Sequence, residues 1–222
     1  MDVAWKSLLA LGRCAASIAW TSVRDIAGKF FGEQVRFPSG RVMAPTNLLA
    51  EGGFSFVYKA REPSSGHDFA LKKIICQDAE AKDAARSEAE AHERFVHKNL
   101  MPLVDKTFTK HPTNSSWEVC WFAFPLCSAS LRDEVTRCVL SDGSEFPWRW
   151  ADIMAMMEGV VQGLAEMHRQ GVAHRDIKPE NILLQRSNGD TSAFGVPVLM
   201  DFGSCSQAEV PVANRREAVL QS

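Results

Sequence analysis

The sequence of 222 residues lacks the patterns that define several classes of protein. Its six cysteines are scattered, and no two have the close spacing of a zinc site. Because no secretory signal precedes them, we expect reduced thiols in a cytoplasmic protein rather than disulfides. No apolar run is long and pure enough to span a bilayer. The run G-x-x-x-x-G-K-[ST] is also absent, which excludes the P-loop class of nucleotide-binding proteins.

A strong charge of either sign is missing as well. The formal net charge is -2, from 25 basic and 27 acidic side chains. Such a balance creates no field that attracts polyanions, so we expect no nucleic-acid partner. What is present is an ordinary globular composition, 45% hydrophobic, of a length that suits one large domain or two small ones.

The N-terminal segment contains few acids and has a helical pattern. Its apolar residues recur at helical spacing, namely at Ala4, Leu8, Leu11, Ala15 and Ile18. We rank first the interpretation that this helix packs on the rest of the protein or frays in solvent. A second is that residues 1–30 lie on a membrane surface, with Trp at the edges and cations toward the head groups. A third is an organelle-targeting peptide, since the segment is poor in acids and contains Arg and Ser.

Two strand patterns separated by a turn occupy the next part of the chain. Residues 48–60 predict a strand, a turn at Gly52 and Gly53, and a second strand. Glycine has no side chain to obstruct a ligand, so the backbone of such a hairpin can approach a phosphate. After a further turn, Ala70-Leu71-Lys72 lies in a run rich in strand-forming residues.

A helix is predicted over residues 78–95, which are dense in Ala, Glu and Arg. One stripe of this helix has spacings of three and four, and its members are Ala84, Ala85, Glu88, Ala91, His92 and Phe95. Glu88 lies in that stripe, whereas Glu90 points away. Glu88 is therefore the carboxylate that we expect to reach Lys72.

Further apolar segments predict two strands and a long helix. Residues 102–104 and 117–124 predict the strands, on either side of a polar turn. Residues 151–169 predict the helix, with an inner face made of Ile153, Met157, Val160, Val161, Leu164 and His168.

The most specific motif follows that helix. It comprises His174-Arg175-Asp176, then Asn181 five residues after the Asp, and later Asp201-Phe202-Gly203. This order is typical of the catalytic loop and metal-binding segment of protein kinases.

Taken together, these parts resemble a eukaryotic protein kinase from about residue 46 onward. Three segments resemble sequences of the Numb-associated kinase family. Within that family they are most similar to the branch of small, fatty-acylated, Golgi-associated serine/threonine kinases. They are Leu-Ala-Glu-Gly-Gly-Phe-Ser-Phe-Val-Tyr, His-Arg-Asp-Ile-Lys-Pro-Glu-Asn-Ile-Leu-Leu and Pro-Val-Leu-Met-Asp-Phe-Gly-Ser. The resemblance implies an α+β fold, with a complete β-rich N-lobe and the first part of a mainly helical C-lobe. We expect an amphipathic extension, 1–45, and a partial kinase domain, 46–222, that ends in the activation segment.

The resemblance also implies ATP and Mg2+ as cofactors and a set of site residues. The implied catalytic residues are Asp176, Lys178, Lys72 and Glu88. The residues implied around ATP are Ala50, Gly52, Gly53, Ser55, Val57, Ala70, Lys72, Pro125, Cys127, Asn181 and Asp201. Asn181 and Asp201 are the implied metal ligands, because their hard oxygens suit Mg2+.

Particular roles follow from the same resemblance. Asp176 is implied to orient the substrate hydroxyl and accept its proton, with Lys178 near the γ-phosphate as in serine/threonine kinases. Phe202 and His174 are expected to stack with His92 and align the two lobes. His174 is thus a structural residue and not a general base.

The chain departs from that branch at two points. Asp2 stands where N-myristoylation needs Gly, and the chain ends without an Ala-Pro-Glu-like motif. Two functions are therefore considered. The first is phosphorylation of Ser and Thr hydroxyls on protein substrates, in the cytoplasm or peripherally on Golgi or endosomal membranes. The alternative is a truncated or pseudokinase-like scaffold that binds nucleotide or partners without catalysis. The presence of Lys72, Asp176 and Asp201 favours the enzyme.

Overall fold

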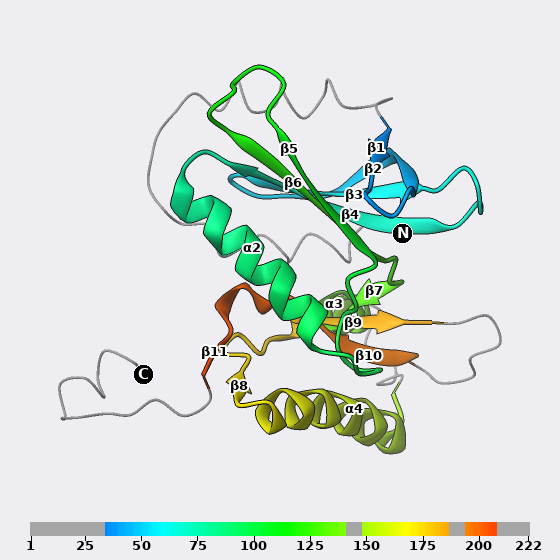
Figure 1. Ribbon diagram of the computed structural model, residues 1–222. Coiled ribbons are helices and arrows are strands. Elements are labelled where there is room, and N and C mark those ends of the chain that lie inside the picture. Colours follow the sequence, from blue (N-terminus) through cyan, green and yellow to red (C-terminus); the bar gives the residue numbers. More distant parts are fainter. Residues whose placement is uncertain (1–33, 141–147, 187–193, 208–222) are drawn as a thin grey trace, which may run out of the picture.

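A six-stranded antiparallel sheet forms the first lobe of the protein (Figure 1). The computed structural model describes residues 34–140, 148–186 and 194–207. In spatial order the strands are β1 (Val35–Arg36), β2 (Val42–Glu51), β3 (Ser55–Arg61), β4 (Asp68–Cys76), β6 (Glu118–Pro125) and β5 (Asp105–Lys110). The predicted hairpin of residues 48–60 is confirmed as the end of β2 and the start of β3.

The strand β6 is buried on both of its faces. Side chains alternate between the two faces of a strand. Cys120, Phe122 and Phe124 of β6 pack in one apolar cluster with residues of the helix α2 (Ala79–Arg94). Trp121 and its alternate neighbours belong to a second cluster on the opposite face. The continuous apolar sequence of β6 is thus the mark of a strand with two buried faces.

The helix α2 begins where its sequence provides a cap. The Asp78 carboxylate accepts a hydrogen bond from the Ala81 backbone N–H at 2.8 Å, which satisfies one free donor of the first turn. The buried face of the helix consists of Ala85, Glu88, Ala89 and His92. The predicted stripe is therefore correct at Glu88 and wrong at Ala84, which is exposed.

The second lobe consists of helices and short strand pairs below the sheet in Figure 1. Its helices are α3 (Leu131–Leu140) and α4 (Trp150–Arg169), with single turns η2 (Pro179–Asn181) and η3 (Phe202–Ser204). Its strands are β7 (Ala129–Ser130), β8 (Val172–Ala173), β9 (Ile182–Gln185), β10 (Val196–Leu199) and β11 (Ser206–Gln207). They pair in the orders β10-β9-β7 and β11-β8.

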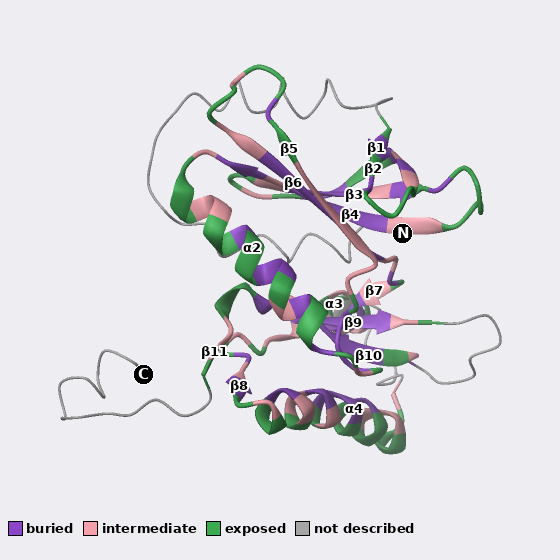
Figure 2. Cartoon of the chain, in the orientation of Figure 1, coloured by how far each residue is buried: buried purple, intermediate pink, exposed green. Residues whose placement is uncertain are grey.

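The predicted inner face of α4 is correct at Val160 and is otherwise rotated by about one residue. The buried residues are Met156, Gly159, Val160, Gly163 and Met167. Met157 and Val161, predicted to be inside, are 46% and 58% exposed. The reason is a close contact with β10: a Cβ at Gly159 would lie 2.5 Å from Pro197 Cγ. Figure 2 shows the buried side of α4 facing the strands and an exposed side facing away.

One further prediction differs from the structure. Residues 102–104 form no strand, and the strand that pairs with β6 begins at Asp105. The boundary between residues 45 and 46 stays a prediction, and it lies within β2. Most of the predicted extension, residues 1–33, lies outside the described residues. Within the described residues, no helix has the length and apolar character needed to cross a membrane.

Candidate active site

Lys72 of β4 forms a buried ion pair with Glu88 of α2. The Nζ atom lies 2.6 Å from Glu88 Oε1, and each residue is 8% exposed. Burial disfavours the charged ammonium, but the carboxylates of Glu88 and Asp201 outweigh that penalty and raise the pKa of Lys72. Lys72 is thus a fixed cation between the helix and the segment that carries Asp201. Such a cation suits a phosphate group.

The loop after β8 folds around the carboxylate of Asp176. Asp176 Oδ2 accepts hydrogen bonds from Lys178 Nζ and Asn181 Nδ2, both at 2.7 Å. Asn181 Nδ2 also donates to the backbone carbonyl of Asp176 at 2.8 Å. Arg175 has the left-handed φ of 66°, and the single turn η2 then returns Asn181 to Asp176. Residues of the loop itself therefore hold the carboxylate in place.

Asn181 and Asp201 provide oxygen atoms suited to a metal ion. Asn181 is 0% exposed, and its Oδ1 has no hydrogen-bond partner among the described residues. Its backbone carbonyl accepts from the Met200 N–H at 3.0 Å, which brings it next to Asp201. An unpaired amide oxygen near a carboxylate fits a hard divalent cation such as Mg2+. The residues present therefore fit the ion that the resemblance implied.

Phe202 contacts two buried histidines from opposite lobes. Its ring centroid is 4.3 Å from that of His92 and 5.8 Å from that of His174. His92 Nδ1 lies 2.9 Å from the Met101 carbonyl, and His174 Nε2 lies 3.0 Å from the Met200 carbonyl. Burial lowers the pKa of His92 to about 4 and also lowers the pKa of His174, so both are neutral donors at pH 7. The three rings predicted to stack meet at Phe202, which is tilted by 32° against His92 and lies edge-on to His174 at 87°.

Four of the residues implied around ATP share one apolar cluster. Ala50 of β2, Val57 of β3 and Ala70 of β4 are buried in it together with Cys127. Pro125 ends β6, two residues before Cys127. Burial raises the pKa of the Cys127 thiol to about 12, so Cys127 offers backbone atoms and apolar surface rather than a reactive thiolate.

One backbone hydrogen bond closes the glycine turn between β2 and β3, and a second ties the turn to β4. The Gly52 N–H donates to the Ser55 carbonyl at 2.8 Å, and the Ile75 N–H of β4 donates to the Phe54 carbonyl at 2.8 Å. The turn at Gly52 and Gly53 is therefore where the sequence placed it. Because the Gly52 N–H is already bonded, a phosphate can use it only if this turn opens.

Two buried side chains near the site were not named from the sequence. Leu183 of β9 and Met200, which precedes Asp201, belong to the same cluster as Ala70 and Val57. The apolar run after Asn181 indicates a buried segment, but the run alone does not show which of its residues faces the first lobe. The pairing of Leu183 with Val198 of β10 decides this, since it sets which face of β9 each residue occupies.

Residues 44–219 match the model of the protein kinase domain. The chain belongs to the protein kinase family. Its kinase domain is 36% identical over 172 residues to "Serine/threonine-protein kinase 16" of Mus musculus and of Homo sapiens. It is 29% identical over 171 residues to "Serine/threonine-protein kinase shk1/pak1" of Schizosaccharomyces pombe. The first two alignments cover 77% of this chain and 52% of each relative, and the third covers 77% and 23%.

The kinase domain has the fold class predicted from the sequence, an α+β fold with a β-rich N-lobe. The chain spans about half the length of the relatives named "Serine/threonine-protein kinase 16". The predicted family is confirmed, and these relatives are serine/threonine protein kinases by name.

Proposed function

We propose that this kinase domain transfers the γ-phosphoryl group of Mg-ATP to serine and threonine hydroxyls of protein substrates. One observation carries the proposal: Lys178 and Asn181 hold the Asp176 carboxylate at 2.7 Å, on a loop whose next strands lead to Asp201. The names of the relatives support serine and threonine as acceptors.

ATP would be bound by groups from both lobes. Lys72, positioned by Glu88, carries the charge for the α- and β-phosphates. Asn181 and Asp201 would hold Mg2+, which when bound offsets the charge of the phosphates. The apolar cluster around Ala70 would receive adenine, with backbone atoms of Pro125 and Cys127 at its edge, and the backbone of Gly52, Gly53 and Ser55 would cover the phosphates.

Asp176 would orient the acceptor hydroxyl and accept its proton. Because Oδ2 already accepts from Lys178 and Asn181, Oδ1 is the oxygen we assign to the hydroxyl. Lys178, beside this carboxylate, would contact the γ-phosphate. This chemistry consists of positioning and charge compensation and needs no covalent intermediate with the enzyme.

The proposal is tested with Asp176→Asn and the matched control Asp83→Asn, a change at an exposed carboxylate of α2. With dephosphorylated casein as acceptor, Asp176→Asn should lower transfer from Mg-ATP at least about a hundredfold, while Asp83→Asn leaves it unchanged. Both should keep the thermal stabilisation that Mg-ATP gives to a binding protein. Unchanged transfer in Asp176→Asn would overturn the assignment. A nucleotide-dependent shift without any transfer by the unmodified chain would instead favour the scaffold.

For location, we propose a cytoplasmic protein with peripheral contact on Golgi or endosomal membranes through residues 1–30. The resemblance to Golgi-associated kinases and the Trp and cationic residues of this segment support it. Sedimentation with isolated membranes tests the proposal. The full chain should pellet, and a chain without residues 1–30 should stay in the supernatant. A full chain that stays in the supernatant would contradict it.

A further inference from the structure

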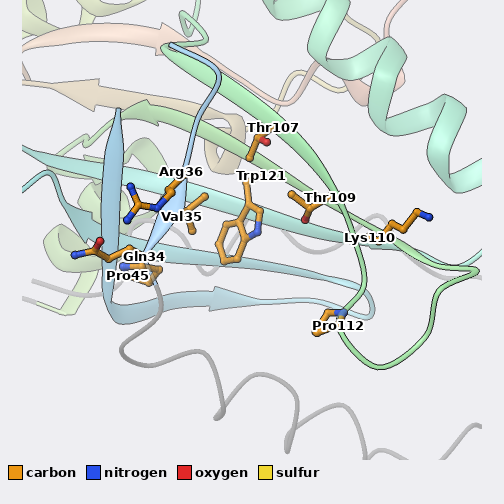
Figure 3. Close-up of a pocket in the computed structure, with 9 residues that line it drawn as sticks. All are labelled: Gln34, Val35, Arg36, Pro45, Thr107, Thr109, Lys110, Pro112 and Trp121. Atoms are coloured by element: carbon orange, nitrogen blue, oxygen red, sulfur yellow. The ribbon is translucent and has the colours of Figure 1, made fainter. Parts of the chain in front are cut away.

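The N-lobe contains a groove that the kinase site does not use. It has a volume of about 310 Å³ and lies between β1 and β5, above β6 (Figure 3). Trp121 lines it, from the cluster on the sheet face opposite to α2. Neither Lys72 nor Asp176 lines it, so its contents would not compete directly with a nucleotide.

The inside of the groove is apolar. Trp121 and Val35 are 5% and 8% exposed, and Pro45 is also buried. Figure 3 shows the Trp121 side chain between the β1 residues on one side and Thr107 and Thr109 on the other. The volume is at the low end for ligand sites, which suits one large apolar side chain better than a nucleotide.

The rim of the groove is cationic. Arg36 and Lys110 line it, both are exposed, and neither forms an ion pair with another described residue. The lining contains no acidic residue. Elsewhere on the same sheet, exposed cations such as Arg61 are paired with carboxylates. The groove therefore complements a negatively charged ligand.

The walls of the groove are the two end strands of the sheet. β1 pairs only with β2, and β5 pairs only with β6, among the described strands. Each strand thus keeps one backbone edge without a pairing strand in that part of the chain. Free N–H and C=O groups of an edge strand can pair with an extended segment of another protein.

We propose that this groove is a docking site for an extended segment of another protein, in which a large apolar side chain is flanked by acidic residues. The apolar side chain would enter above Trp121, and the acidic residues would face Arg36 and Lys110. The segment of this chain that precedes the first lining residue, Gln34, suits the cationic rim less well than an acidic segment would. Residues 1–33 carry four basic residues and only three acidic ones, namely Lys6, Arg13, Arg24 and Lys29 against Asp2, Asp25 and Glu33.

The test begins with selection of random displayed peptides on the immobilised full chain. The enriched peptides should carry Asp or Glu next to Phe, Trp, Leu or Ile. A fluorescent synthetic copy should then bind the double variant Arg36→Glu, Lys110→Glu at least about tenfold more weakly, since two attractions become repulsions. Lys98→Glu, an exposed change near the end of α2, is the matched control and should bind normally. All variants should keep their melting temperature, because the altered side chains are exposed.

Three results would overturn the proposal. The first is enrichment of peptides without acidic residues, and the second is binding that the double charge reversal leaves unchanged. The third comes from a photo-cross-linking benzoylphenylalanine at position 109 of the full chain. Cross-links to the added peptide support the docking site. Cross-links to residues 1–33 of the same chain would show that the groove is occupied internally.

Discussion

At the level of single residues, the buried ion pair between Lys72 and Glu88 contributes to stability and positions the lysine that we propose for the phosphates of ATP. We expect Glu88→Gln to destabilise the protein by about 2 kcal/mol, because the buried Lys72 ammonium loses its hydrogen-bonded carboxylate and keeps only the charge of Asp201. Glu90→Gln, on the exposed side of the same helix, should change stability by less than about 0.5 kcal/mol. Urea denaturation of both variants measures the difference.

A second substitution separates charge from packing at that pair. Lys72→Met in the Glu88→Gln background removes the buried ammonium that has lost its ion-pair partner and should recover part of the lost stability. If the double variant is less stable than Glu88→Gln alone, the cost is one of packing and the electrostatic account is wrong.

His92 makes stability depend on pH. Its native pKa is about 4, lowered from 6.5 mainly by burial, so the unfolded chain binds a proton between these values that the native protein does not. Stability should therefore fall as pH falls from 6.5 to 4, by about 3 kcal/mol from this residue. His92→Gln should show a shallower loss over that window. His67→Gln, on an exposed turn, is the control for urea midpoints measured at each pH.

At the level of elements, the buried face of a helix could be predicted from the sequence where apolar residues recur on that face. Glu88 could be chosen over Glu90 because α2 has one buried face. Lys72 could be chosen over Lys73 only because Ala70 stands two residues before it, since β4 buries both lysines. In α4 the same method failed, since glycines rather than large apolar residues form the close contact. Sequence patterns favour large apolar residues as core, and no pattern shows that Gly159 faces β10.

The close contact between Gly159 and β10 predicts that Gly→Ala lowers stability, which is opposite to its usual effect in a helix. In an open helix, Gly→Ala stabilises by about 1 kcal/mol. Gly159→Ala should instead destabilise by about 1–3 kcal/mol, because the new Cβ would lie 2.5 Å from Pro197 Cγ and 2.9 Å from Asn99 Nδ2. Ala155→Gly, on the exposed side of α4, serves as the control and should cost about 1 kcal/mol. A urea midpoint that rises in Gly159→Ala would contradict the close contact.

At the level of the whole molecule, the packing of α4 leaves an apolar stripe on its outer side. Its members recur at spacings of three and four and are exposed, namely Trp150 at 74%, Met154 at 52%, Met157 at 46% and Val161 at 58%. Figure 2 shows this outer side of α4 turned away from the strands. A contiguous exposed apolar patch is uncommon on a monomeric protein and favours contact with apolar molecules.

The stripe should bind an apolar fluorescent dye such as anilinonaphthalene sulfonate under native conditions. We expect the double variant Met157→Gln, Val161→Gln to remove most of the fluorescence enhancement without lowering the melting temperature, because both side chains are already exposed. Val196→Gln, a 40% exposed apolar residue on β10, is the matched control and should leave the enhancement unchanged. Dye binding that survives the double variant would mean that another surface is responsible. A lowered melting temperature would mean that these side chains are packed in solution, so that α4 is rotated relative to the strands.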